Sequence, residues 1–221
     1  MQGLSRQERD TTCIHEAAHA VLFALGGIAV YRLAVAPLGA VAWRTGSRNG
    51  RFCSGLWGLC EKADLILPRP FLRWLMHEGG LRADALGYES LLRQPEGRAQ
   101  AAGFAPILQQ QIRAQMLGLL AGSLAEQLHQ GQSPQLQAAD DRHEIAKAQD
   151  LAWLLTGPAE FAHAAEQAEK KLREPTIWAQ VATLAEALAA AGELSSGLRT
   201  YLPNPLPDWP PAPDCQVGSA F

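Results

Sequence analysis

Three shortages limit what this sequence can be: it has little charge bias, no long apolar run and no closely spaced cysteine pair. The 221 residues carry a formal net charge of -3, so electrostatics give no reason to expect nucleic acid as a partner. The longest apolar stretch, 17–30, is interrupted by His19 and two glycines, so we expect no membrane span. Charged side chains between positions 6 and 10 stand where a signal peptide needs apolar residues, and a cytoplasmic location is expected.

The spacing of the cysteines argues against a zinc ribbon and against a thiol redox site. None of the four has a C-x-x-C neighbour, which is the spacing of zinc ribbons and of many thiol redox sites. We expect free, reduced thiols, as in most cytoplasmic proteins. The residues concerned are Cys13, Cys53, Cys60 and Cys215.

Apolar residues are plentiful, at 48%, and most recur at helical spacing. They predict one mainly α-helical domain over residues 1–200 with a small β element. The expected helices cover residues 5–25, 107–130, 140–155, 159–172 and 176–191. Alternation over 30–43 predicts two short strands around a glycine-containing turn. The stretch 46–103 is irregular apart from a candidate helix near 71–77, and the proline-rich segment 201–221 is expected to be a flexible tail.

The first predicted helix carries the sequence His15-Glu16-Ala17-Ala18-His19, an H-E-x-x-H pattern. Residues four apart share one helix face, so both imidazoles can bind one tetrahedral zinc ion. Glu16 lies beside them and is expected to act as the base for a water activated by the metal. The pattern therefore predicts a zinc metallopeptidase, with Zn²⁺ as cofactor. The plainer interpretation is two ordinary histidines and a helical glutamate.

A catalytic zinc ion usually has three protein ligands and one open position. Asp141 can begin the helix expected over 140–155, where the helix dipole favours a carboxylate, but Asp140 and His143 compete with it. The alternative role for Asp141 is that of an ordinary helix cap. Glu126 is a candidate for orienting a zinc-bound imidazole, and a solvent-facing role is the alternative.

Two further segments concern the surroundings of the site. Small residues over 118–123 should let another helix approach the helix at 107–130 closely. The strand at 33–35 can either bind an extended peptide at a sheet edge or belong to a core hairpin.

Four segments occur in an order typical of one known family: His-Glu-Ala-Ala-His-Ala-Val at 15–21, Ala-Pro-Leu-Gly at 36–39, Leu-Ala-Gly-Ser-Leu-Ala-Glu at 120–126 and Ala-Ala-Asp-Asp at 138–141. Together they resemble the protease domain of FtsH-type ATP-dependent zinc metalloproteases, over roughly residues 8–45 and 107–155. The resemblance implies a zincin-like metalloprotease fold, peptide or unfolded protein as substrate, and Asp141 as the third zinc ligand.

The resemblance does not extend to that family's ATPase module or membrane anchor. We therefore expect the domain to cut flexible or unfolded chains, or to work with a separate ATPase or adaptor. The alternative function is a catalytically weak, protease-like binding or regulatory module that retains the zinc fold. A zinc hydrolase acting on other bonds is a third hypothesis.

Overall fold

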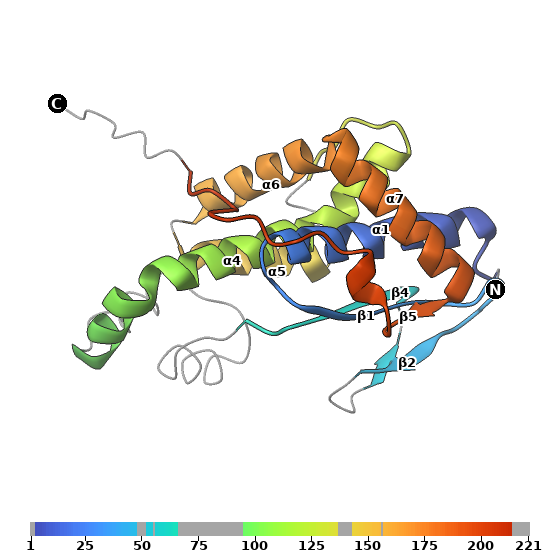
Figure 1. Ribbon diagram of the computed structural model, residues 1–221, viewed down its shortest axis with the longest axis horizontal. Helices are drawn as coiled ribbons and strands as arrows, with labels where there is room; N and C mark the ends of the chain where they lie inside the picture. The colour runs from blue at the N-terminus through green and yellow to red at the C-terminus, as the bar shows by residue number, and fades with distance from the viewer. Residues whose placement is uncertain are drawn as a thin grey trace.

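The computed structural model describes residues 3–47, 52–54, 56–65, 95–136, 143–155 and 157–213. Most of these residues are helical, as expected, and the strands are few and short (Figure 1). The helices are α1 (Arg6–Leu25), α4 (Pro95–His129), α5 (His143–Trp153), α6 (Pro158–Leu172) and α7 (Pro175–Ala191), with a 3-10 turn at Leu198–Thr200. The strands are β1 (Val30–Val35), β2 (Arg44–Gly46), β3 (Phe52–Ser54), β4 (Gly58–Lys62) and β5 (Glu193–Leu194). None of the described helices is both long and apolar enough to cross a membrane.

Helix α1 begins where the sequence indicates. The Ser5 hydroxyl accepts a hydrogen bond from the Glu8 amide at 3.3 Å, and the Glu8 carboxylate accepts one from the Ser5 amide at 2.8 Å. This reciprocal pair is a capping box, which satisfies amides that the first turn leaves without partners. The helix ends at Leu25, and Gly27 then takes a positive φ of 77° that turns the chain toward β1.

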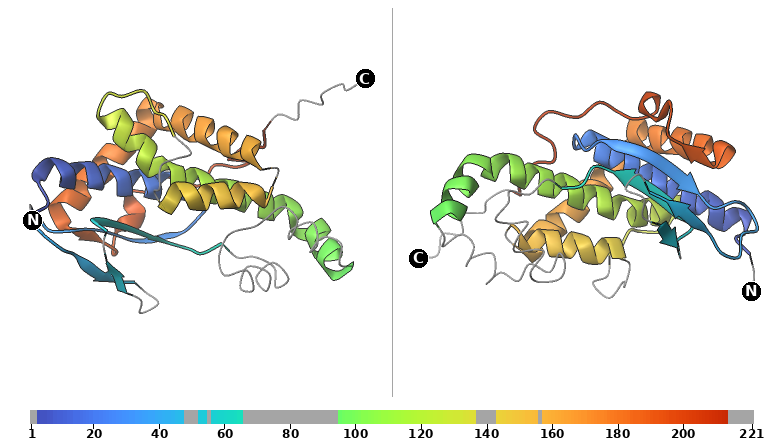
Figure 2. Two further views of the ribbon diagram at one scale, coloured as in Figure 1. Left: turned by 180° about the vertical axis from the view of Figure 1, so that it is seen from behind. Right: turned by 90° about the horizontal axis from the view of Figure 1, so that it is seen from below.

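Helix α1 is the centre of the structure. From Cys13 to Leu25 nearly every side chain is buried, because α4, α7 and the strands β1 and β4 all pack against the helix (Figure 2). Helices α5 and α6 pack on α4 and extend the helical layer. This arrangement puts the H-E-x-x-H residues at the junction of α1, α4 and β4.

The main sheet differs from the hairpin that the sequence predicts. Its order is β4-β1-β5, and β1 pairs antiparallel with both neighbours. The chain does turn at Gly39, where φ is 78°, but the second predicted strand does not pair with β1. Instead β2 pairs with β3 in a separate two-stranded sheet. The true partner, β4, has no β-branched residue, so its strand propensity is weak.

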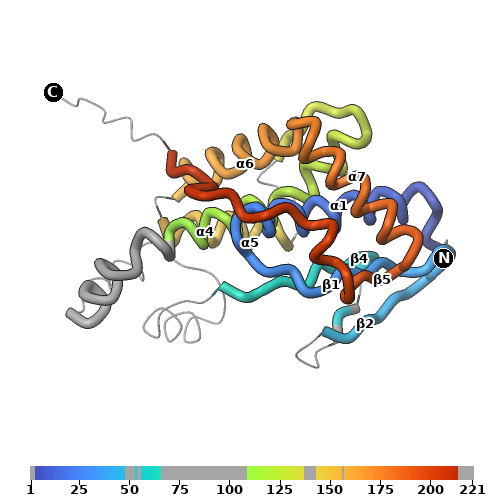
Figure 3. The backbone as a smooth tube through the Cα atoms, viewed as in Figure 1, coloured from blue at the N-terminus to red at the C-terminus, as the bar shows by residue number. Residues whose placement is uncertain are grey.

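The proline-rich segment packs on the body over residues 201–213, so the prediction of a flexible tail is wrong for this part. The Leu206 amide donates to the Leu25 carbonyl at 2.9 Å, and the Trp209 side chain is 8% exposed. Figure 3 shows the segment running back along the helical layer toward α6. A large apolar side chain among the prolines supplies the burial that composition alone did not indicate. Residues 214–221 lie outside the described part.

Other predictions have mixed outcomes. Helices α6 and α7 begin at Pro158 and Pro175, close to their expected starts, whereas α4 begins at Pro95, three turns earlier than expected. Cys13, Cys53 and Cys60 are free thiols, as expected. The candidate helix near 71–77, Cys215, and the aspartates at 140 and 141 lie outside the described residues.

A buried ion pair joins α4 to α6. The Arg113 guanidinium donates to both carboxylate oxygens of Glu160, at 3.0 and 2.6 Å. Glu160 is 1% exposed, so loss of one partner would leave the other charge buried without compensation.

We therefore predict that Glu160→Gln lowers the free energy of unfolding by about 3–5 kcal/mol, the usual cost of breaking a buried pair from one side. Chemical denaturation in metal-free buffer measures it. Glu169→Gln is the matched control, because Glu169 pairs with the half-exposed Arg173 on the surface of α6 and should cost less than about 1 kcal/mol. Equal losses in the two variants would contradict the prediction.

Candidate metal centre

All three residues of the H-E-x-x-H pattern lie on α1, on the side that faces α4 and β4. Glu16 is 7% exposed and His19 is 4% exposed, while the side chain of His15 is 13% exposed. The two imidazole rings meet edge to face, with centroids 4.4 Å apart. The helical spacing thus brings the two rings together, as the sequence predicts.

The two imidazoles direct the same ring atom toward one point. Nε2 of His15 lies 2.8 Å from Nε2 of His19. Two zinc–nitrogen bonds of about 2.0–2.1 Å at a tetrahedral angle would hold these atoms about 3.3 Å apart. If the two Nε2 atoms moved apart by about half an ångström, which small side-chain rotations allow, the ion would fit between them.

The opposite ring nitrogens are both held by α4. Nδ1 of His19 is 2.6 Å from the carbonyl oxygen of Gly118, and since a carbonyl can only accept, Nδ1 carries the hydrogen. Nδ1 of His15 lies 2.8 Å from the Glu126 carboxylate. Glu126 therefore contacts an imidazole, the position considered for it from the sequence. Both bonds leave the Nε2 lone pairs available, which is the arrangement found in metal-binding histidines.

Gly122 of α4 makes room for both rings. A Cβ atom at this position would lie 2.5 Å from Nε2 of His15 and 2.6 Å from Nε2 of His19. At Gly118, one turn earlier, a Cβ atom would overlap the Phe23 ring. The small residues of 118–123 therefore do allow a close helix approach, and the space that they leave lies at the convergent nitrogens.

A third group reaches this point from α5. One carboxylate oxygen of Glu144 and one ring nitrogen from each of His15 and His19 lie within 4.8 Å of one another. This is the group of possible metal ligands found among the described residues, and it does not include His143. Asp141 and Asp140 lie outside those residues, so their position as ligands stays a prediction.

Sequence reasoning missed Glu144, because the pattern placed the third ligand at Asp141, with Asp140 and His143 as the competing residues. The helical spacing of the sequence did indicate where Glu144 lies. Glu144 lies four residues before Ala148, which is buried together with Ile145, so the carboxylate borders the buried face of α5.

Burial and neighbouring charges shift the proton affinities of the site. Burial raises the pKa of Glu16 to about 7, with the charges of Glu144 and Glu126 adding to the rise and His15 opposing it. Burial lowers the pKa of His19 to about 3, so this imidazole is neutral at neutral pH, as a metal ligand must be. For His15, burial lowers the pKa, but the hydrogen bond to Glu126 and the nearby carboxylates outweigh it and raise the pKa.

The residues present fit a zinc ion better than a hard cation. Two neutral imidazole nitrogens and one carboxylate form a donor set common in catalytic zinc sites, whereas magnesium and calcium prefer oxygen ligands alone. Comparison with known proteins adds no assignment, since no family model and no curated protein matches the chain.

The close approach at Gly122 generates a prediction. We expect Gly122→Ala to weaken zinc binding by at least about tenfold, because the added methyl group displaces the two imidazoles. Competition with a chromogenic chelator measures the affinity. Gln111→Ala, at an exposed position of the same helix, is the control and should bind zinc as the unaltered protein does. Unchanged affinity in Gly122→Ala would show that the ion does not bind between the two rings.

Proposed function

We propose that the protein is a zinc metallopeptidase in which His15, His19 and a carboxylate from the start of α5 hold the metal and Glu16 is the catalytic base. The observation that carries this proposal is the 2.8 Å approach of the two Nε2 atoms, with both Nδ1 atoms already engaged by α4. Two histidines that served only packing would have no reason to direct both Nε2 atoms to one point while both Nδ1 atoms are hydrogen-bonded.

The bound zinc would supply Lewis acidity toward water and toward a substrate carbonyl. Glu16 would accept a proton from the attacking water and return it to the departing amine. A base is most effective when its pKa lies near the working pH, and burial raises that of Glu16 to about 7. Glu126 would fix the ring orientation of His15 through the hydrogen bond to Nδ1.

Strand β4 is the best candidate for binding an extended peptide. It pairs with β1 along one edge, and no strand among the described residues pairs with its other edge. The site considered at 33–35 is less suitable, because β1 has neighbours on both sides. A peptide that added to β4 would lie beside Glu16, since a Cβ atom at Gly58 would overlap the Glu16 carboxylate.

Flexible or unfolded chains are the substrates that suit this arrangement, because an added strand must first be extended. A separate ATPase or adaptor remains the candidate partner for folded substrates, and a cytoplasmic location remains the expectation from the sequence. The rival function, a protease-like regulatory module, is distinguished from the peptidase by the role of Glu16.

We predict that Glu16→Gln retains one zinc ion per chain but loses about 10²- to 10⁴-fold in cleavage of unfolded casein, the usual contribution of a general base. Metal analysis and a fluorescent casein assay give the two readings. Glu166→Gln, at an exposed position of α6, is the matched control and should cleave normally. If the unaltered protein binds zinc and cleaves nothing, the regulatory module becomes the better interpretation.

The third ligand has its own test. We expect Glu144→Gln to reduce zinc affinity by more than the roughly 10- to 100-fold that loss of an outer hydrogen-bond partner costs, because Glu144 lies within reach of both imidazoles. Asp141→Asn is the comparison and should retain zinc. Loss of zinc in Asp141→Asn alone would instead assign the third ligand to the residue that the family resemblance implies.

A further inference from the structure

A lysine from β4 stands at one end of the row of site residues on α1. The row runs along one helix face at intervals of four, from His15 to His19 and then to Phe23. The rings of His19 and Phe23 are stacked, with centroids 6.1 Å apart and an interplanar angle of 23°. The Lys62 ammonium lies over the other end, 5.0 Å from the Phe23 centroid.

The Lys62 ammonium forms no ion pair with a carboxylate in the described part of the chain, although Asp64 is near enough to influence its pKa. Its ammonium donates one long hydrogen bond, of 3.4 Å, to the Ala63 carbonyl, and the side chain is half-buried. Burial lowers the pKa of Lys62, and the positive charge of Lys147 adds to this effect against the opposing influence of Cys60 and Asp64. A half-buried cation without an ion-pair partner is costly unless something else supplies the anion.

Lys147 brings a second positive charge to the same region from another element. It lies three residues after Glu144 on α5, so the two side chains project from neighbouring positions of one helix face. Since Glu144 reaches the imidazoles, Lys147 lies one turn further along α5. Two lysines from β4 and α5 thus flank the same end of the metal centre.

The distance from Lys62 to the metal-site histidines can be compared with the length of a bound peptide. Successive steps of 6.1 and 5.0 Å place the Lys62 ammonium within about 11 Å of the His19 ring. An extended chain advances about 3.3–3.6 Å per residue, so this is the reach of about three residues. Gly58 and Lys62 lie on the same face of β4, because side chains alternate along a strand, and Gly58 abuts Glu16.

We propose that Lys62, assisted by Lys147, binds a carboxylate of the peptide substrate within three residues of the bond that is cut. This inference rests on the proposed peptidase function and specifies its substrate class: unfolded chains with an acidic group beside the scissile bond. The carboxylate has two possible sources, the side chain of an internal Glu or Asp residue and the C-terminus of the peptide.

The test compares peptides that differ in one charge. A quenched fluorogenic peptide with blocked ends is synthesised as a series in which a single Glu moves through three positions on each side of the centre, with Gln at the same position as reference. A second pair carries no acidic side chain and has either a free or an amidated C-terminus. The zinc-loaded full chain is assayed as unaltered protein, Lys62→Met and Lys62→Arg.

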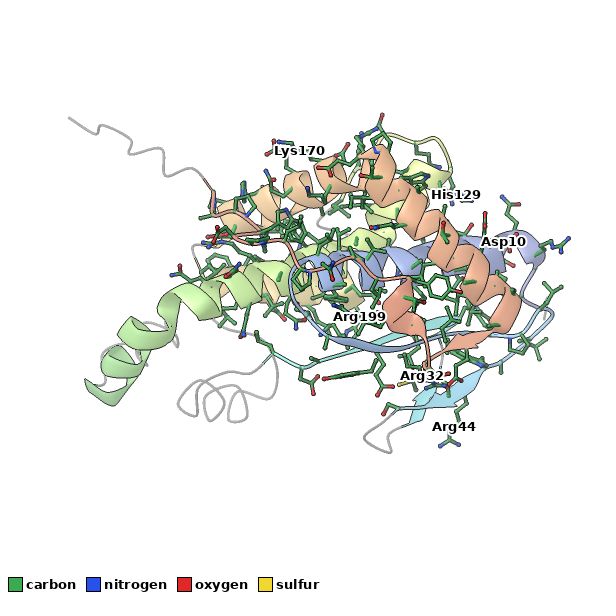
Figure 4. The ribbon with its side chains drawn as sticks, viewed as in Figure 1. Asp10, Arg32, Arg44, His129, Lys170 and Arg199 are labelled. Carbon is green, nitrogen blue, oxygen red and sulfur yellow. The ribbon has the colours of Figure 1, made fainter. Side chains whose placement is uncertain are left out.

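We expect one Glu position, or the free C-terminus, to raise kcat/KM by on the order of tenfold over its neutral reference, the usual effect of a hydrogen bond to a charged group. Lys62→Met should abolish this ratio while keeping the apolar stem over Phe23, and Lys62→Arg should retain much of it. Lys170→Met, on the outer side of α6 (Figure 4), should change nothing. A ratio that is the same in Lys62→Met as in the unaltered protein would overturn the inference.

Binding separates failure of this inference from failure of the proposed function. Fluorescence anisotropy of the same peptides with zinc-loaded Glu16→Gln reports affinity without cleavage, and Glu16→Gln/Lys62→Met reports the contribution of the lysine. If no peptide is cut but charge-dependent binding is present and is lost in the double variant, the carboxylate site stands and the peptidase function fails. If peptides are cut without charge preference, the peptidase function stands and the lysine has another role.

Discussion

Helix α4 approaches α1 closely at two glycines, and this close contact determines the form of the candidate metal centre. Gly118 lies against the Phe23 ring, and Gly122 lies against both imidazoles. The same approach lets α4 supply the groups that orient those rings, the Gly118 carbonyl and the Glu126 carboxylate. A larger residue at either position would separate the helices. The packing of the two helices and the orientation of the two imidazoles therefore both depend on this close approach.

That contact also explains the unusual electrostatics of the site. Close packing removes water from around Glu16 and His19, which makes their charged forms costly and moves the two pKa values in opposite directions. Burial of several ionisable groups without full compensation is destabilising in itself. A bound cation would relieve part of this cost, because a nearby positive charge stabilises the ionised Glu16 carboxylate and a ligand imidazole is neutral, as His19 already is. This cost supports the proposal that the site binds a metal ion.

Local patterns predicted the parts of the site that lie on one element, and missed those that depend on long-range contacts. The Ser5 capping box, the spacing of His15 and His19, and the small residues around Gly122 are each readable within one or two helical turns. Glu144 was not found, because its role depends on how α5 packs on α4. Strand β4 was missed for a related reason, since its pairing with β1 joins segments more than twenty residues apart and its own β propensity is low. Trp209 was missed in the same way, because it packs against residues that are distant in the sequence and the proline content of its segment does not indicate this packing.

In the proposed peptidase, strand β4 would connect the catalytic base to substrate selectivity. At its first residue, Gly58, a side chain would collide with Glu16, so the absence of a side chain there leaves room for the Glu16 carboxylate beside the open edge. Its last residue, Lys62, lies over Phe23 at the far end of the same face. Because both residues belong to one short strand paired with the centre of the sheet, the separation between base and ammonium is fixed by backbone geometry rather than by flexible loops. A peptide aligned on β4 would therefore present its scissile bond and its acidic group at a set spacing.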